Sequence, residues 1–144
     1  MPSADAVRAW HAAIQVAVRT RALAERLPLH RFAELRDQMI RAAESVAHNI
    51  AEGRGSIYER EYVRFLDMAA RSANELSSQL TELMAYEVVS KREVFNLNGT
   101  VICTRRMIES LRDAVQRDYR TKLANKREPQ HEPGKRAKTE KGQS

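Results

Sequence analysis

The chain has 144 residues, 42% of them hydrophobic and 31% charged, with a net charge of +6, and this composition indicates one globular domain rich in helix-forming residues. No apolar run approaches the roughly 20 residues that cross a bilayer, and the N-terminus lacks the apolar core of a signal peptide, so we expect a soluble, cytoplasmic protein without membrane contact. Cys103 is the single cysteine, which excludes an intramolecular disulfide and disfavours a structural zinc site.

A first helix is predicted to begin after Ser3 and to end at Leu27. Ser3 is a typical N-cap residue, Asp5 is placed near the positive end of the helix dipole, and Pro28 cannot continue the backbone hydrogen bonds. Apolar residues recur at helical spacing along one face of this segment. The predicted core face consists of Val7, Trp10, Ile14, Ala17, Val18, Leu23 and Leu27.

The middle of the chain is predicted to form two helices joined by a glycine turn. Gly53 and Gly55 are expected to end the second helix, because glycine readily adopts the left-handed conformation found at helix C-termini. Ser56 and Glu59 have capping-box spacing, which predicts the start of a third helix. The seam residues are Phe32, Leu35, Met39, Ala42, Val46 and Ile50, followed by Tyr62, Phe65, Leu66, Ala69, Ala73, Leu76, Leu80 and Leu83.

A long fourth helix is predicted to begin at Lys91. Ser90 and Glu93 repeat the capping-box spacing soon after the third helix ends near Tyr86. Thirty-odd helical residues at about 1.5 Å each span about 50 Å, so the end of this helix is expected to project beyond its partners. Its seam consists of Val94, Leu97, Val101, Thr104, Ile108, Leu111 and Val115.

Four amphipathic helices with short connections predict an all-α fold, an antiparallel up-down-up-down four-helix bundle over residues 1–124. This topology places the start of the first helix, the glycine turn and the end of the fourth helix at one end. Residues 125–144 have no apolar period, so we predict a disordered basic C-terminal tail that leaves from that end.

Residues 41–80 carry a combination of polar and apolar residues that matches a known family signature. The stretch resembles the small bacterial four-helix bundle proteins encoded in intervening sequences of 23S rRNA genes, to which the accessory variability determinant of diversity-generating retroelements is related. The resemblance implies a homopentamer, no enzymatic activity and a link to nucleic acid. The matching residues are Arg41, Ala42, Ala43, Ser45, Asn49, Ile50, Ala51, Glu52, Gly53, Glu61, Arg64, Phe65, Leu66, Ala69, Ser72, Glu75, Leu76, Gln79 and Leu80.

Polar members of this signature have two interpretations. Because they lie on or beside apolar stripes, we interpret them as residues that fix helix register or close a buried hydrogen-bond network, with a direct ligand role as the alternative. Arg41 and Arg64 are placed to pair with Glu52, Glu61 or Glu75 across the hairpin. The structural signature residues are Arg41, Ser45, Asn49, Glu52, Gly53, Arg64, Glu75 and Gln79.

No catalytic, metal or cofactor site is predicted. Helical di-iron proteins use Glu-x-x-His on two helices, and this spacing occurs only once in the sequence, at Glu128 and His131 in the predicted disordered tail. Glu44, His48 and Glu52 share one helix face and would approach a metal from one side only, which favours a solvated surface. Arg105 and Arg106 lie beside Cys103 in the sequence, but no histidine is near it to act as a base.

Positive charge is concentrated towards the two ends of the chain. Residues 91–124 carry 8 Lys and Arg against 4 Asp and Glu, whereas residues 57–90 carry 3 against 6. Basic groups outside the hairpin would contact phosphates in a sequence-independent, salt-sensitive manner, and the shortage of exposed aromatics argues against base readout. The candidate nucleic-acid-binding residues are Arg19, Arg21, Arg26, Arg105, Arg106, Arg112, Arg117, Arg120, Lys122, Lys126, Arg127, Lys135, Arg136 and Lys138.

Two functions remain open at this point. The first is a non-enzymatic homo-oligomer that binds RNA or DNA backbone, as an accessory to a reverse transcriptase or an rRNA intervening sequence; five copies would carry about +30. It predicts that charge reversal at Arg105, Arg112 and Arg117 abolishes RNA binding. The second is a protein-interaction scaffold with no nucleic-acid role. Oligomerisation is expected from apolar or small residues outside the main stripes, namely Ala12, Ala13, Ile102, Met107 and Ala114.

Overall fold

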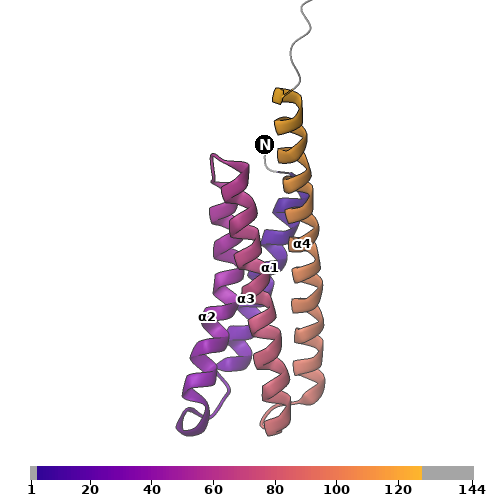
Figure 1. Cartoon of the computed structure of the whole chain (residues 1–144). Helices are drawn as coiled ribbons and strands as arrows, with labels where there is room; N and C mark the ends of the chain where they lie inside the picture. Colours follow the sequence, from indigo (N-terminus) through magenta and orange to yellow (C-terminus); the bar gives the residue numbers. More distant parts are fainter. Residues whose placement is uncertain (1–2, 128–144) are drawn as a thin grey trace, which may run out of the picture.

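The computed structural model describes residues 3–127, and within them four helices form the predicted all-α bundle (Figure 1). Successive helices run in opposite directions, and each packs against two neighbours, with α1 also contacting α4 so that the bundle closes. The predicted fold is therefore confirmed. The helices are α1 (Ala4–Ala24), α2 (Leu29–Arg54), α3 (Glu59–Tyr86) and α4 (Lys91–Arg127).

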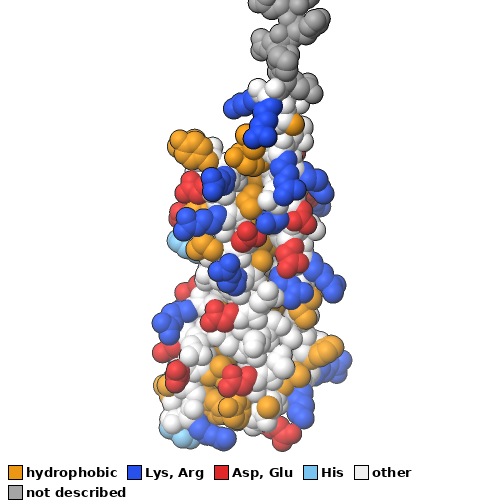
Figure 2. Space-filling model, viewed as in Figure 1, with side chains coloured by type: hydrophobic (Ala, Val, Ile, Leu, Met, Phe, Trp, Pro, Cys, Tyr) orange, Lys and Arg blue, Asp and Glu red, His pale blue; other side chains and the backbone are white. Residues whose placement is uncertain are grey.

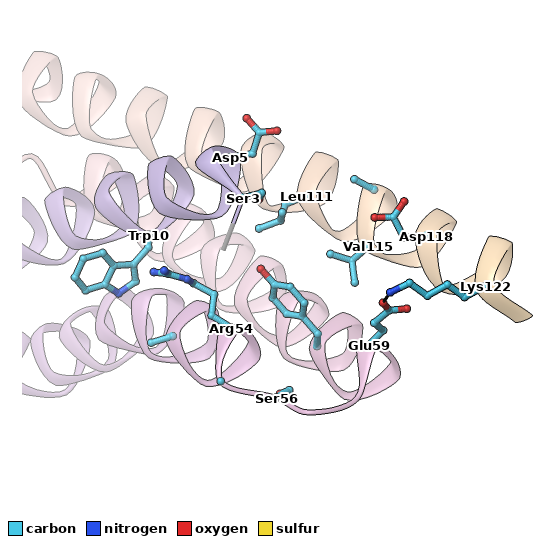
Figure 3. A pocket seen from close by; sticks show the side chains of 14 residues that line it. Ser3, Asp5, Trp10, Arg54, Ser56, Glu59, Leu111, Val115, Asp118 and Lys122 are labelled. Atoms are coloured by element: carbon cyan, nitrogen blue, oxygen red, sulfur yellow. Dashed lines mark hydrogen bonds and ion pairs between the residues drawn. The ribbon is translucent and has the colours of Figure 1, made fainter. Parts of the chain in front are cut away.

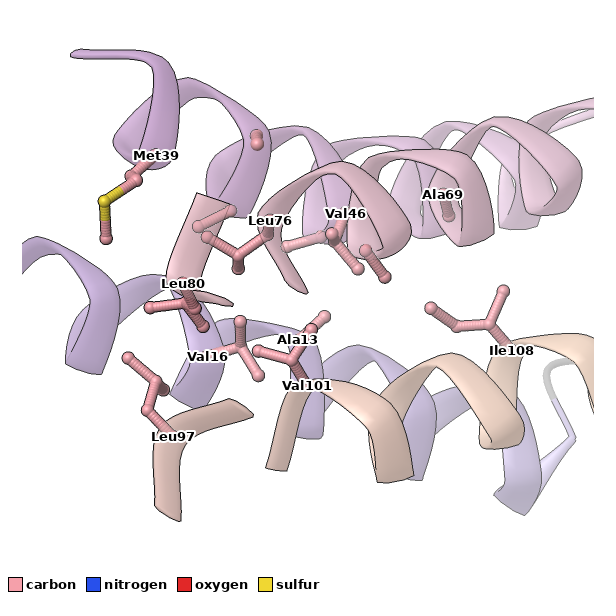
Figure 4. Close-up of a cluster of buried hydrophobic side chains, with 14 of the residues drawn as sticks. Ala13, Val16, Met39, Val46, Ala69, Leu76, Leu80, Leu97, Val101 and Ile108 are labelled. Atoms are coloured by element: carbon pink, nitrogen blue, oxygen red, sulfur yellow. The ribbon is translucent and has the colours of Figure 1, made fainter. Parts of the chain in front are cut away.

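The core contains most of the predicted seams of α2, α3 and α4, whereas Leu35, Tyr62 and Phe65 are half-buried. Met39 and Val46 from α2, Leu76 and Leu80 from α3, and Ile108 from α4 are each at most 1% exposed, and Figure 4 shows the side chains pointing into the space between the helices. The α4 seam is buried as far as Leu111, and Val115 is half-buried. Large apolar side chains at helical spacing thus mark the buried face of these three helices correctly.

The predicted core face of α1 is correct only in part. Trp10 and Ile14 are only half-buried and Val18 is 59% exposed, although Leu23 and Leu27 are buried as predicted. Small side chains allow α1 to lie close against its neighbours, which turns the larger side chains toward the edge of the helix pair. The residues of α1 that face the core are Ala6, Ala9, Ala13, Val16, Thr20, Leu23 and Ala24.

The boundaries of α1 agree with the prediction at one end. The Ser3 hydroxyl accepts a hydrogen bond from the Ala6 backbone N–H at 3.1 Å, as expected for an N-cap. The helix ends at Ala24, three residues before Leu27, because the chain tightens into a turn in which the Leu27 N–H donates to the Ala24 carbonyl. Pro28 then precedes the first residue of α2.

The glycine turn differs from the prediction. Gly53 lies inside α2, and Gly55 caps the helix at φ −81°, so neither residue is left-handed. A Cβ on Gly53 would lie 2.7 Å from the ring of Tyr62, so the close approach of α3 accounts for this glycine. The Ser56 hydroxyl donates to the Glu52 carbonyl instead of capping α3.

The second capping signal is confirmed and explains where α4 begins. The Glu93 backbone N–H donates to the Ser90 hydroxyl at 3.4 Å, and α4 starts at Lys91. The helix has 37 residues, about 55 Å, against 28 residues, about 42 Å, for α3. Its last turns rise beyond the α2–α3 turn, which lies at the same end of the bundle (Figure 1).

The predicted tail falls largely outside the described residues. Residues 125–127 continue α4 as helix, three residues past the predicted boundary. The remaining tail positions, including Lys135, Arg136 and Lys138, lie outside the part of the chain that the structure describes. Over residues 3–127, no helix is both long and apolar enough to cross a membrane.

Candidate nucleic-acid interface

The predicted basic residues of α1 and of the turn after it are engaged in contacts between helices. Arg21 on α1 forms an ion pair with Glu44 on α2 and lies 3.7 Å from Glu25. The hydrogen bond to Glu44 raises the pKa of the Arg21 guanidinium. Arg26 pairs with Glu93 on α4. Each of these two cations faces a carboxylate, which reduces its contribution to a phosphate-binding surface.

Two candidates in the middle of α4 are also held by neighbours. The Arg112 Nε lies 2.9 Å from the Asp67 carboxylate on α3, and this hydrogen bond raises the pKa of the guanidinium. Arg105 donates to the Asn74 side-chain oxygen at 2.7 Å and lies 3.6 Å from the Glu109 carboxylate. Both arginines therefore link α4 to α3.

Arg19 on α1 is engaged by a neutral partner. Its guanidinium donates to the Thr100 hydroxyl on α4 at 2.8 Å. The contact joins α1 to α4 and fixes the direction of the side chain, and within residues 3–127 Arg19 forms no ion pair with a carboxylate. Arg19 lies on α1, apart from the basic residues at the far end of α4.

The basic end of α4 comprises Arg117, Arg120, Lys122, Lys126 and Arg127. Between residues 117 and 127 these five cations are opposed by one carboxylate in the sequence, Asp118. Lys122 pairs with Glu59 on α3, and the hydrogen bond to that carboxylate raises the pKa of the ammonium group. The other four cations form no ion pair within residues 3–127. Figure 2 shows Lys and Arg side chains gathered on this upper part of the molecule.

A groove of about 630 Å³ continues this cationic surface along α4 toward α1. Arg106 and Arg117 line it eleven residues apart, which places them three helical turns apart on one face of α4. Arg8 from α1 also lines the groove, but it pairs with Asp5. Arg106 lies outside the last turns of α4 but on the same helix face, and it has no carboxylate partner in the described chain. It is thus the one further candidate that extends the cationic surface.

A second groove, of about 720 Å³, opens between α1, the glycine turn and α4 (Figure 3). Apolar side chains including Trp10 and Val115 line it, and half-buried Tyr62 also faces it. Burial raises the pKa of Tyr62, and the nearby Arg54 charge opposes this by a smaller amount. The rim carries carboxylates as well as cations, with Lys122 pointing toward Glu59 in Figure 3. Its mixed charge gives this groove no preference for a polyanion.

Several signature residues lie together where α2 packs against α3. Ser45 and Ser72 are joined by a hydrogen bond of 2.9 Å, and Asn49 donates to the Ser45 hydroxyl. Farther along α3, Gln79 donates to Glu75 at 3.3 Å. The contacts of Ser45, Ser72 and Asn49 lie within the α2–α3 hairpin, whereas Gln79 and exposed Glu75 are both on α3.

The predicted ion pairs of Arg41 and Arg64 are not formed. Arg41 donates to the Asp37 backbone carbonyl at 3.4 Å, and within the described chain neither arginine pairs with Glu52, Glu61 or Glu75. Both side chains are exposed, so water satisfies them without a carboxylate partner.

In residues 3–127, no three His, Cys, Asp or Glu side chains gather in a way that would hold a metal ion.

Sequence reasoning missed several residues at the projecting end. Tyr58 in the α2–α3 turn is 70% exposed, and Phe95 at the opposite end of the bundle is 70% exposed, so exposed aromatics are more available than expected. Tyr58, Arg60 and Tyr119 line one cleft beside the basic end of α4. The predicted topology could have identified these residues, because it already placed this turn and the end of α4 together.

The fold and its basic, projecting helix define a four-helix bundle protein. The profile of the 23S rRNA-intervening sequence protein family matches residues 5–110, and the chain belongs to that family. The match ends before the basic end of α4. No curated protein matches the chain.

A solved structure supports the same fold. It is a protein of unknown function from the S23 ribosomal protein family of Bacteroides thetaiotaomicron, 21% identical in sequence, with a TM-score of 0.66. The similarity covers 72% of this chain and 96% of that chain.

Proposed function

We propose that this protein is a non-enzymatic, homo-oligomeric bundle that binds RNA or DNA backbone through the basic end of α4. The observation that carries the proposal is the local excess of cations between residues 117 and 127, most of them without a carboxylate partner in the described chain. Residues 120–127 are all exposed, so these groups are accessible to phosphates. Contacts of this kind give affinity that depends on salt more than on base sequence.

The pairing of the other cations narrows the proposed surface. Arg21, Arg26, Arg105 and Arg112 contact acidic or amide groups of neighbouring helices and are better suited to holding the bundle together. To bind a phosphate, these side chains would have to give up exposed or half-exposed contacts that each contribute a small stabilisation. The proposed surface consists of Arg106, Arg117, Arg120, Lys126 and Arg127.

Oligomerisation would multiply this surface. On α4, Ile102, Met107 and Ala114 are half-buried in a single chain, as are Trp10 and Ile14 on α1, and a second copy would remove such side chains from water. The resemblance to the family implies a homopentamer, which would carry about +30 and attract a polyanion over a longer range. An RNA containing an intervening sequence, or a reverse transcriptase with its RNA, is the partner that this proposal favours.

Charge reversal tests the proposal. Arg117→Glu with Arg120→Glu is compared with Arg71→Glu with Arg92→Glu, a control that makes the same charge change at exposed arginines elsewhere. Binding of a fluorescent 30-nucleotide RNA of mixed sequence is measured by anisotropy from about 50 to 300 mM KCl. The first variant is expected to lose at least tenfold in affinity and about two in the slope of log K against log salt.

Several results would overturn the proposal. Unchanged RNA affinity in the Arg117/Arg120 variant removes the surface, and an equal loss in the control shows that only net charge matters. Circular dichroism and light scattering of each variant verify that the bundle and its assembly persist. Protein partners that are captured from lysate and survive nuclease treatment, combined with unchanged RNA affinity, would favour the scaffold function instead.

A further inference from the structure

A cleft of about 350 Å³ lies between the α2–α3 turn and the basic end of α4. Aromatic, aliphatic and cationic side chains all reach it from these two elements. We propose that it binds a nucleotide of single-stranded nucleic acid, whose base stacks on tyrosine while the flanking phosphates contact the cations. The residues that carry this inference are Ile57, Tyr58, Arg60, Tyr119, Leu123 and Lys126.

The tyrosine rings of this cleft are available for stacking. Tyr58 is 70% exposed and Tyr119 is half-buried. Within residues 3–127, the aromatic ring pairs are Trp10–His11 and Phe32–Tyr86, so neither cleft tyrosine packs against another ring. Ile57 is 89% exposed beside them. An apolar, aromatic surface of this kind is left in water unless something covers it.

The charges around the cleft suit a phosphate strand. Glu59 is the carboxylate that lines it, and this group is already paired with Lys122. Arg60 and Lys126 line the same cleft and form no ion pair in the described part of the chain. Stacking aromatics flanked by cations are the combination that single-strand binding proteins use, and it tolerates any base because every base has a π face.

This arrangement distinguishes single strands from duplexes. Bases inside a duplex are stacked on each other, so they cannot lie against Tyr58 or Tyr119 without being unpaired. The inference rests on the proposed function, because the basic end of α4 supplies the cations on one side of the cleft. It adds a preference for unpaired strands that phosphate contacts alone would not produce.

Substitution of Tyr58 tests the cleft directly. Anisotropy is measured with a fluorescent 15-nucleotide oligo(U) and with a 15-base-pair RNA duplex at about 100 mM KCl. Tyr58→Ala is expected to weaken oligo(U) binding about fivefold or more and to change duplex binding less than about twofold, since one stacked base is lost. Tyr58→Phe keeps the ring and is expected to bind oligo(U) like the unmodified chain.

Phe95 provides a matched control because it is as exposed as Tyr58 and lies near the start of α4, whereas the cleft lies beside the end of this helix. Phe95→Ala is expected to leave both affinities unchanged. Photocrosslinking to oligo(5-bromouracil) gives a readout without any substitution. Tryptic peptides spanning residues 55–60 and 118–120 contain Tyr58 and Tyr119, and an adduct on either supports the cleft, whereas adducts confined to other peptides overturn it.

The outcomes separate this inference from the proposed function. If the Arg117/Arg120 variant loses affinity for both RNAs while Tyr58→Ala changes neither, the cleft fails and backbone binding stands. If the Arg117/Arg120 variant retains both affinities, both proposals fail. Vesicles of phosphatidylserine and phosphatidylcholine provide a final comparison: a loss of vesicle binding in Tyr58→Ala with unchanged oligo(U) binding would assign the cleft to a lipid surface and overturn the inference.

Discussion

The Ser45 hydroxyl on α2 lies 2.9 Å from the Ser72 hydroxyl on α3, and this contact joins the two helices at one fixed height. Asn49, which is 5% exposed, donates to both the hydroxyl and the backbone carbonyl of Ser45, at 3.0 and 2.9 Å. Apolar contacts allow neighbouring helices to slide, whereas a buried polar pair has one favourable register. The Ser45–Ser72 contact therefore specifies how α2 and α3 align, and Asn49 holds Ser45 in place from within α2.

Removal of this network is expected to destabilise the bundle unequally. Asn49→Ala deletes two hydrogen bonds at a buried position and is expected to lower the free energy of unfolding by about 1–3 kcal/mol, whereas Ser72→Ala deletes one and costs about 0.5–1.5 kcal/mol. Urea unfolding followed by circular dichroism measures both values. Equal stability of Asn49→Ala and the unmodified chain would contradict a structural role for this network.

Gly53 and Gly99 form a matched pair of helical glycines with opposite expected effects. A Cβ at Gly53 would meet Tyr62 Cδ2 at 2.7 Å and Phe65 Cβ at 3.2 Å, whereas a Cβ at Gly99 meets nothing within 4 Å. Gly53→Ala is expected to lower stability by about 1–3 kcal/mol through overpacking. Gly99→Ala is expected to raise it by up to about 1 kcal/mol through helix propensity. If the thermal unfolding midpoint rises for both variants, α3 can shift to accommodate a Cβ at position 53 without a loss of stability.

The sequence allowed three of the four core faces to be predicted, and the exception has a physical reason. In α2, α3 and α4 the large apolar residues, such as Leu76 and Ile108, are the buried ones. In α1 the buried face includes Ala6, Ala9 and Ala13, which carry weak hydrophobic signals. A helical pattern based on the large apolar residues follows Trp10 and Ile14 instead. It therefore predicts a core face of α1 that is rotated about the helix axis from the observed one. Close packing favours small residues where helices approach each other most closely.

The cations of the candidate interface could be predicted from the sequence, but their ion-pair partners could not. An excess of cations in the fourth helix is visible in the sequence, yet Arg112 and Asp67 are 45 positions apart, and Arg26 and Glu93 are 67 positions apart. Helical spacing predicts contacts three or four residues away and is silent on contacts across the bundle. Those partners decide which cations remain available, and they became identifiable only when the helices were placed.

Arg112 is expected to contribute to stability and not to RNA binding. Its ion pair with Asp67 links α4 to α3 in a half-buried environment, so Arg112→Gln should lower the free energy of unfolding by about 0.2–1 kcal/mol. RNA affinity of this variant should change less than about twofold. The exchange variant, Asp67→Arg with Arg112→Asp, is expected to recover part of the stability. A tenfold loss of RNA affinity in Arg112→Gln, with the fold intact, would return this residue to the binding surface.

Self-association is expected to depend on the half-buried apolar residues of α4. Light scattering should give a mass several times the 16.5 kDa of one chain. Met107→Glu with Ile102→Glu places two charges among these side chains and is expected to shift the mass toward the monomer while circular dichroism retains the helical signal. Leu29→Glu, at a position 58% exposed, serves as the control. A monomer mass for the unmodified chain would remove the oligomer from the proposed function.

Tyr62 is expected to make stability sensitive to alkaline pH. Burial raises its pKa in the folded chain above the ordinary value of about 10, so the folded state retains the phenolic proton to higher pH than the unfolded state. The resulting stabilisation is fully present below about pH 10 and is lost as the pH rises through the folded pKa. Tyr62→Phe removes this titration and preserves the ring that packs near Gly53.

The measurement that isolates this effect is the difference in unfolding midpoint between the unmodified chain and Tyr62→Phe at pH 8, 9, 10 and 11. The pKa of Lys122 is also raised, by its hydrogen bond to Glu59, so both chains lose stability over this range. The unmodified chain should lose more, because charging Tyr62 against the core carries a desolvation cost that phenylalanine avoids. Absorbance at 295 nm should show one fewer tyrosine titrating above pH 10 in the variant. Parallel midpoint curves would mean that the Tyr62 hydroxyl reaches water in the folded bundle.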